Sequence, residues 1–193
     1  MTTNDQAMDG GTDYRASVWV DGYVLNPIQL KSDVQLLNYS VAFMSRTSML
    51  GSIMLCCVDE APCGQPGEAP AQPNAAFRQH VALYKARQRP ILRGGSMYHI
   101  LPKPDGMNWD GFQFYNRKLR HGSVFLFKPA ADAASSKRIF LKGLDRATNY
   151  SLEYQDRVEQ NVAVASGAEL MDRGVLVSGL DGVQASEIIW IRG

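Results

Sequence analysis

The sequence carries almost no net charge and has no long hydrophobic run. Lys and Arg number 20 against 19 Asp and Glu over 193 residues, so no overall field attracts nucleic acid or an acidic membrane surface. The longest apolar run, "GSIMLCCV", is far too short to cross a bilayer. The first residues, "MTTNDQAMDGGTDYR", lack the basic flank and apolar core of an export signal. We therefore expect a soluble chain with no nucleic acid and no membrane among its partners, in a compartment that the sequence does not specify.

Cysteine and histidine are also scarce. The cysteines are Cys56, Cys57 and Cys63, and the histidines are His80, His99 and His121. Neither set has the spacing of a zinc site, and no histidine accompanies a Cys or Ser nucleophile motif. Free cysteines in such a setting are most often buried on a core strand. The sequence therefore predicts no metal site and no cofactor.

The first half of the sequence alternates between strand-like and helical patterns. The first 14 residues are polar and aperiodic, which is typical of a mobile tail. Four elements are expected after them: a strand within 16–24 that ends near Asp21 and Gly22, a helix over 33–46, a strand over 52–58 and a helix over 75–89. Ser32 and Gln35 fit a capping box for the first helix, and Pro90 should end the second. The Pro- and Gly-rich stretch over 59–74 can only be a loop. Residues 15–93 thus form an α/β segment.

The pattern changes after Gly94 and Gly95, where no helical period of useful length returns. The short segments that follow are rich in β-branched and aromatic residues and are separated by turn residues: "SMYHIL", "GFQFYN", "SVFLFKP", "RIFLKGL", "NYSLEY", "GVLVSGL" and "SEIIWIRG". A single helical turn is expected within 167–174. Seven such strands suffice for an all-β antiparallel sandwich over 94–193.

The α/β segment is a poor candidate for an independent domain. Two strands with two helices leave backbone ladder groups and apolar faces uncovered. Either the segment packs on the sandwich, or it is the end of a larger barrel.

Four stretches in the same order and spacing resemble a known family. They are "HVALYKARQRPILRGGSMYHILP", "NWDGFQFYNRKLRHGSVFLFKP", "IFLKGLDRATNYSLEY" and "SGAELMDRGVLVSGLDGVQASEIIWIRG". Together they resemble the carboxy-terminal end of the α-galactosidase-type glycoside hydrolases of family 36, over about 31–193. The family's "YK..RP" pattern matches Tyr84, Lys85, Arg89 and Pro90, and its "SG.EL...GL.V" pattern matches 166–175 except that Val175 replaces the usual Leu.

The resemblance implies a retaining exo-glycosidase with a (β/α)8 barrel followed by a β-sandwich. Such an enzyme uses two Asp residues about 5 Å apart, one as nucleophile and one as acid and base. Alignment of the tail makes "SVWVDGY" and "GSIMLCCV" the seventh and eighth barrel strands. Both catalytic positions then precede residue 1, so we assign no catalytic residue and expect the chain alone to be inactive.

Five residues are candidates for contact with a carbohydrate. Asp21, Tyr23 and Asp59 stand near the carboxyl ends of the two expected barrel strands, where barrel enzymes place functional groups, although Asp21 before Gly22 also fits an ordinary turn. On the sandwich, alternation directs Phe112 and Phe114 to the core and leaves Trp109 and Tyr115 to stack on a sugar.

Two weaker patterns have ordinary explanations. Asp105 and Asp110 around Trp109 fit a turn better than a calcium or sugar site. The basic cluster "RKLRHG" over 117–122 fits a solvated hairpin turn better than a binding patch.

Three functions remain open on the sequence. The first is a structural and pocket-rim role as the carboxy-terminal portion of a family 36-like enzyme. The second is a free-standing carbohydrate-binding sandwich that uses Trp109 and Tyr115. The third is an obligate subunit that completes a barrel whose other strands a protein partner supplies.

Overall fold

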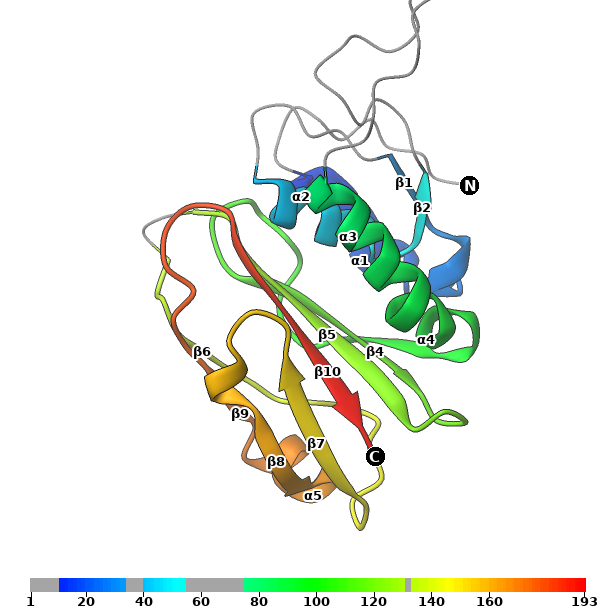
Figure 1. Ribbon diagram of the computed structural model, residues 1–193, viewed down its shortest axis with the longest axis vertical. Coiled ribbons are helices and arrows are strands. Elements are labelled where there is room, and N and C mark those ends of the chain that lie inside the picture. The colour runs from blue at the N-terminus through cyan, green and yellow to red at the C-terminus, as the bar shows by residue number, and fades with distance from the viewer. Residues whose placement is uncertain (1–10, 34–39, 55–74, 131–132) are drawn as a thin grey trace, which may run out of the picture.

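A six-stranded antiparallel sheet forms the centre of the molecule (Figure 1). The computed structural model describes residues 11–33, 40–54, 75–130 and 133–193. In spatial order the strands are β3 (Ser96–His99), β4 (Asp110–Asn116), β5 (His121–Lys128), β10 (Ala185–Arg192), β7 (Asn149–Tyr154) and β8 (Val162–Ser166). A register shift between Tyr150 and Leu152 interrupts the β7–β8 ladder.

Helices and two short strands lie over one face of this sheet (Figure 1). These elements are α1 (Thr12–Asp21), η1 (Pro27–Gln29), β1 (Lys31–Asp33), α2 (Val41–Ser48), β2 (Ser52–Met54), α3 (Ala75–Leu83), η2 (Tyr84–Gln88) and α4 (Arg89–Gly94). The strands β1 and β2 pair in parallel, from Lys31 with Ser52 to Asp33 with Met54.

A second β layer covers the opposite face. It consists of the antiparallel pair β6 (Lys137–Ile139) and β9 (Val175–Val177), with α5 (Gly167–Asp172) and η3 (Val158–Gln160) in the connections. The expected antiparallel β fold is thus confirmed, as is the helical turn within 167–174. Strand β8 was missed, because "VAVAS" is short and has no alternation of apolar and polar residues.

Strict alternation in β4, β5 and β10 supplies the hydrophobic cores on both faces. Phe114, Phe125 and Trp190 belong to the cluster under the helices. Their neighbours Tyr115, Val124 and Ile191 belong to the cluster under the β6–β9 layer. Antiparallel strands usually leave one face to water, but these three are buried on both faces because each face carries a layer of its own. The sheet therefore ties the helical layer and the second β layer into one packed structure.

The strand predicted over 16–24 is wrong, since most of that stretch lies in helix α1. Tyr14 and Val18 are one turn apart and both are buried against the sheet. Packing of this helical stripe overrides the strand propensity of Val and Trp in "SVWVDGY". The helix also begins at Thr12, inside the stretch expected to be a mobile tail.

The predicted start of the next helix is also wrong. Ser32 lies in strand β1, and α2 begins after Ser40, whose hydroxyl accepts a hydrogen bond from the Phe43 N–H at 3.4 Å. The parallel partner of β2 is therefore the segment 31–33 and not 16–24. The cysteines, the loop over 59–74 and the rest of the strand over 52–58 lie outside the described residues.

The helix expected to end at Arg89 continues through Pro90 to Gly94. A π-helical turn over Tyr84–Gln88 precedes α4, and Pro90 then occupies the first turn of α4. Proline is tolerated there because first-turn N–H groups need no partner within their own helix. In the part of the chain that the structure describes, no helix is long and apolar enough to cross a membrane.

Candidate functional site

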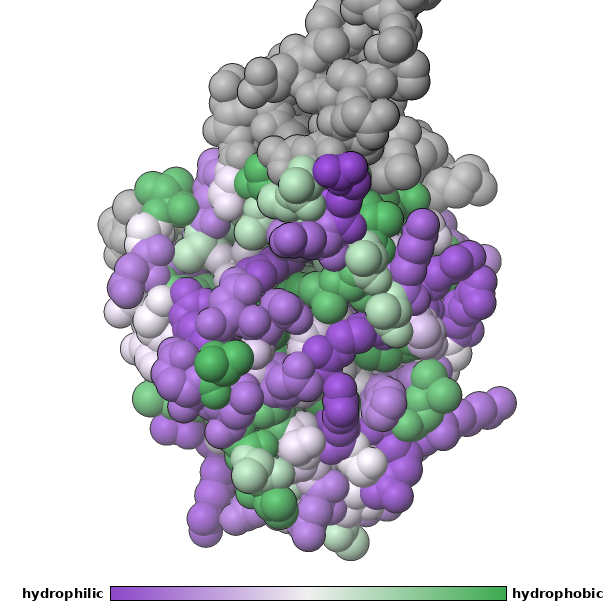
Figure 2. Space-filling view, viewed as in Figure 1, coloured by the Kyte–Doolittle hydropathy of each residue, from purple (hydrophilic) through white to green (hydrophobic). Residues whose placement is uncertain are grey.

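A cleft opens where the helices meet the end of the large sheet. It has a volume of about 560 Å³ and lies between α2, α3 and the residues that follow β7. We call it the seam cleft; its lining is Ala42, Arg46, Gln79, His80, Ala82, Leu83, Ala86, Arg87, Gln155 and Asp156. The face of the molecule seen in Figure 2 is mostly hydrophilic, with hydrophobic side chains in small separate areas.

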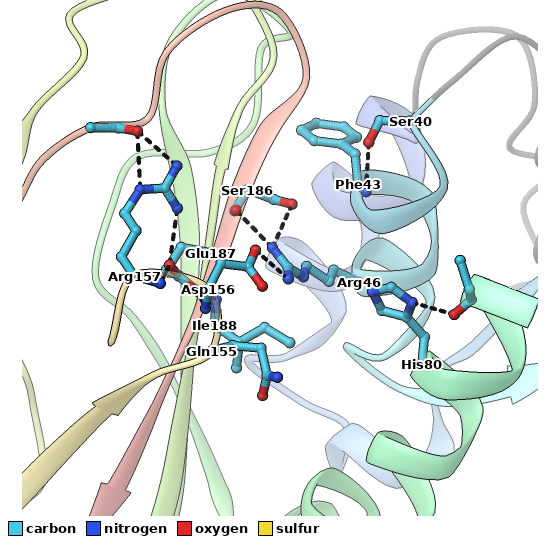
Figure 3. Close-up of polar contacts among 12 residues, drawn as sticks. Ser40, Phe43, Arg46, His80, Gln155, Asp156, Arg157, Ser186, Glu187 and Ile188 are labelled. Carbon is cyan, nitrogen blue, oxygen red and sulfur yellow. Dashed lines mark hydrogen bonds and ion pairs between the residues drawn. The ribbon is translucent and has the colours of Figure 1, made fainter. Parts of the chain in front are cut away.

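Arg46 of α2 joins the helical layer to the sheet across this cleft (Figure 3). Its Nη1 donates to the Ser186 carbonyl oxygen at 2.7 Å and to the Ser186 Oγ at 3.2 Å, and its Nη2 contacts the Asp156 carboxylate at 2.6 Å. The guanidinium is buried, whereas the Asp156 side chain is 48% exposed. Charge-assisted bonds of this kind fix α2 against β10 and leave one accessible carboxylate at the cleft.

The Glu187 carboxylate lies behind the cleft, fully buried, and has a structural role. It accepts hydrogen bonds from the backbone N–H groups of Asp156 at 3.1 Å and Arg157 at 3.2 Å. It also accepts from its neighbour Ile188 N–H at 2.8 Å and forms an ion pair with the Arg157 guanidinium at 2.9 Å. Both oxygens of Glu187 are thus occupied in holding the turn after β7 (Figure 3).

His80 presents a hydrogen-bond acceptor to the cleft. Its Nδ1 lies 2.8 Å from the Ala76 carbonyl oxygen, which can only accept, so Nδ1 carries the proton. Burial lowers the pKa of His80, the Ala76 bond opposes the shift, and the Arg46 charge adds to it. The neutral ring has a lone pair on Nε2 that meets no donor among the described residues.

The seam cleft combines apolar and polar contacts in the way that small-molecule sites do. Alanine side chains form part of its wall, Arg46 and the two glutamine amides supply donors, and Asp156 and His80 supply acceptors. Such a mixture suits a small polyhydroxylated molecule. Sequence reasoning missed this site, because its parts come from residues 42–87 and 155–156 and no local motif links them.

A buried ion pair anchors α1 to the sheet beside this region. The Arg15 Nε donates to both Asp110 carboxylate oxygens at 3.0 and 3.1 Å, and both side chains are almost fully buried. The guanidinium lies 4.9 Å from the centre of the Phe43 ring and 4.8 Å from that of Phe127. Burial raises the pKa of Asp110 to about 6, although the Arg15 charge opposes that rise.

The two aspartates near Trp109 have structural partners. Asp110 pairs with Arg15, 95 residues away in the sequence, which no turn pattern indicates. Asp105 accepts from the Met107 and Asn108 N–H groups at 2.9 and 2.8 Å, so the turn predicted at this residue is confirmed.

Of the five residues predicted to contact a carbohydrate, the four that the structure describes do not come together. Asp21 ends helix α1, and Tyr23 follows it in the turn that leads toward β1, so neither stands at the carboxyl end of a strand. The Tyr23 ring stacks on His99 with centroids 4.2 Å apart, and Tyr23 is 65% exposed. Asp59 lies outside the described residues.

The expectation that Trp109 and Tyr115 offer exposed rings is wrong. Both face away from the helices as alternation predicts, but the β6–β9 layer covers that face and each is 4% exposed. The Trp109 Nε1 donates to the Ala134 carbonyl oxygen at 2.6 Å, and the Tyr115 hydroxyl bonds that of Tyr150 at 3.2 Å.

Comparison with known proteins agrees with this architecture. Residues 109–191 match the family model described as the glycosyl hydrolase family 36 C-terminal domain. No curated protein matches the chain.

Solved α-galactosidases share the fold over almost the whole chain. A variant of AgaA from Geobacillus stearothermophilus, solved with raffinose, has 20% identity and a TM-score of 0.70, covering 99% of this chain and 25% of its own. The α-galactosidase from Lactobacillus brevis has 16% identity and a TM-score of 0.71, covering 96% and 25%. The galactosidase domain of the α-galactosidase–sucrose kinase AgaSK has 13% identity and a TM-score of 0.72, again covering 96% and 25%. The chain thus spans about a quarter of the length of these structures.

The fold defines a class: an antiparallel β-sandwich with a helical layer packed on its larger sheet. The family model over residues 109–191 adds a resemblance in sequence, and the solved structures share the fold. The resemblance to the carboxy-terminal part of family 36 glycoside hydrolases is confirmed.

Proposed function

We propose that this chain acts as the carboxy-terminal portion of a family 36-like glycoside hydrolase, in which residues 15–93 form the end of the (β/α)8 barrel and 94–193 the supporting sandwich. The observation that carries the proposal is the parallel pair β1 and β2 with α2 between them and α3 after them. This is the repeating unit of an α/β barrel. The proposal assigns the last two barrel positions to strands 31–33 and 52–54 rather than to 16–24 and 52–58.

The proposed role is structural, and the paired catalytic aspartates belong to the part of the enzyme that precedes these strands. Two features of the described residues support this. Glu187 is occupied by four hydrogen-bond donors, and Asp110 is paired with Arg15 inside the core. Neither carboxylate is free to attack an anomeric carbon or to protonate a leaving oxygen.

The pocket-rim part of the role rests on fewer residues. Tyr23 has the exposed ring that sugar stacking requires. Asp21 and Asp59 stay predictions. Trp109 would need the β6–β9 layer to move, so we place no contact on it.

Hydrogen exchange tests whether the α/β segment depends on a larger barrel. In the isolated chain, backbone amides of β1 and β2 should exchange far faster than those of β5 and β10, because two strands alone leave ladder groups open to water. Equal protection of β1 and β5 would contradict the proposal.

A second candidate, a free-standing carbohydrate-binding module, is favoured by the polar lining of the seam cleft and by the exposed ring of Tyr23. Titration of the full chain with galactose and raffinose distinguishes the two. Saturable binding that is weakened in Gln155→Ala or Tyr23→Ala, and kept in Gln29→Ala on the exposed turn, would favour the module. The subunit alternative predicts instead a stable complex with a protein that carries the paired aspartates.

A further inference from the structure

A second cavity lies at the turn between β4 and β5. It has a volume of about 400 Å³, and its polar lining comes from Tyr115, Arg117, Arg120, Asp145, Thr148 and Tyr150. We call it the turn cavity. Its walls are the β4–β5 turn and the loop that precedes β7.

Two buried tyrosine hydroxyls lie at the base of this cavity. They carry two hydrogens, but the described residues provide an acceptor for only one of them. The hydroxyls of Tyr115 and Tyr150 lie 3.2 Å apart, and the Tyr150 oxygen also accepts from the Asp145 N–H at 3.0 Å. Of the two phenolic hydrogens, one lies between the two oxygens. The other finds no acceptor among the described residues, whichever tyrosine donates to its neighbour. A buried O–H group in this state points to an acceptor that enters the cavity.

The charges around the cavity favour an anion. Arg117 and Arg120 form no ion pair with the described residues, whereas the one carboxylate in the lining, Asp145, already accepts from the Ala147 N–H at 2.9 Å. Burial and the bond with Tyr150 raise the pKa of Tyr115, and the charges of Arg120 and Arg117 oppose that rise. The field of both guanidiniums therefore reaches the phenol at the base of the cavity.

The backbone at Arg120 supports the same interpretation. Its φ is 55°, in the left-handed region where glycine would cost nothing. The Arg120 carbonyl oxygen accepts from the Gly193 N–H at 2.9 Å, which fixes the turn beside the end of β10. Strained backbone conformations of this kind persist only where the surrounding structure fixes them, and they cluster at binding and active sites.

We propose that the turn cavity binds a small ligand with an oxyanion group, a carboxylate or a phosphate, held by Arg117 and Arg120 with the free phenolic hydrogen as a third donor. Guanidinium groups match the planar oxygens of such ligands, and neutral donors inside the cavity add direction. Thr148 and Asp145 can bond hydroxyl groups on the same ligand, so a sugar acid or a sugar phosphate fits the whole lining.

Calorimetric titration of the full chain with glucuronate, glucose 6-phosphate, inorganic phosphate and glucose tests this proposal. We expect at least one of the three anions to bind saturably, with an affinity that falls as salt is added, and glucose to bind at least about tenfold more weakly. The ratio of the glucuronate to the glucose 6-phosphate affinity shows which oxyanion the cavity prefers.

Two variants locate the binding. Arg120→Gly removes a guanidinium and the backbone strain together, so it should weaken anion binding at least about tenfold without loss of thermal stability. Lys118→Gln removes a positive charge from the same turn but not from the cavity and should leave the affinity unchanged. No saturable anion binding, or an equal loss in both variants, would overturn the proposal. These readouts are independent of the chain's role in a hydrolase.

Discussion

Asp110 and Arg15 show what a single pair of residues contributes to the fold. The pair is fully buried and joins α1 to β4. We expect Asp110→Ala to lower the free energy of unfolding by about 3–5 kcal/mol, because it leaves the Arg15 charge buried without a partner. Urea denaturation followed by circular dichroism measures the loss.

Two variants serve as controls for this prediction. Asp105→Ala removes a carboxylate five residues away in an exposed turn and should cost no more than about 1 kcal/mol. The double change Arg15→Met with Asp110→Leu removes both charges and should recover much of the loss. Similar losses of unfolding free energy in Asp105→Ala and Asp110→Ala would show that burial of the Arg15–Asp110 ion pair does not make Asp110 more important to stability than an exposed turn residue.

His80 should make stability depend on pH. Burial lowers its pKa in the folded chain below the usual value of 6.5. The unfolded chain therefore binds a proton first as the pH falls, so the contribution of His80 is present above about pH 6.5 and is lost as the pH falls through the folded pKa. When the pH is lowered from about 7.5 to 5.5, the free energy of unfolding of the unsubstituted chain should fall by more than that of the His80→Gln variant. Equal losses would contradict the assigned protonation of His80.

At the scale of elements, the junction between α4 and β3 depends on close backbone contact. A Cβ atom added at Gly95 would lie 2.5 Å from the Ile91 carbonyl oxygen and 3.2 Å from that of Tyr115. A Cβ at Gly94 would meet only the Asn116 side chain, at 3.1 Å. We expect Gly95→Ala to cost about 1–3 kcal/mol and Gly94→Ala to change stability by less than about 1 kcal/mol in either direction.

Thermal unfolding of the two variants measures this difference. The pair is matched, because both changes add one methyl group at neighbouring positions. A larger loss for Gly94→Ala than for Gly95→Ala would show that the helix does not pack against β4 in the way described.

The sequence predicts the sandwich far better than the helical layer. Strands such as 123–129 and 186–193 are rich in β-branched and aromatic residues and are bounded by turn residues, so local pattern and final structure agree. The stretch 16–24 has the same composition, but most of it is helical. The helix is stabilised by burial of Tyr14, Arg15 and Val18 against residues about 100 positions later. A local sequence pattern cannot predict such a long-range contact.

The candidate sites could not be predicted from the sequence either, because they also depend on contacts between distant residues. Alternation placed Trp109 and Tyr115 on the correct face of β4, but it does not show that β6 and β9 return to cover that face. Arg46 reaches Ser186 across 140 residues, and Tyr115 meets Tyr150 in the turn cavity across 35 residues. The near-neutral charge of the whole chain favours a solvated turn over 117–122, but it does not show that Arg117 and Arg120 line a cavity.

At the scale of the whole molecule, the chain is a sandwich with a short α/β unit packed on one face. The parallel pair β1 and β2 belongs to a kind of sheet that is stable only when further strands and helices cover it. The chain covers only about a quarter of each solved structure that shares this fold. Both observations are consistent with the proposal that the chain works as part of a larger hydrolase.

Hydrolysis of nitrophenyl α-galactoside by the purified chain tests this account most directly. The sample should first be shown to unfold cooperatively, so that inactivity cannot be attributed to misfolding. We expect no hydrolysis above the uncatalysed rate, because the proposal assigns the paired catalytic aspartates to another part of the enzyme and because Glu187 and Asp110 are committed to structural bonds. Turnover by the chain alone, abolished by a single carboxylate substitution within it, would contradict the account.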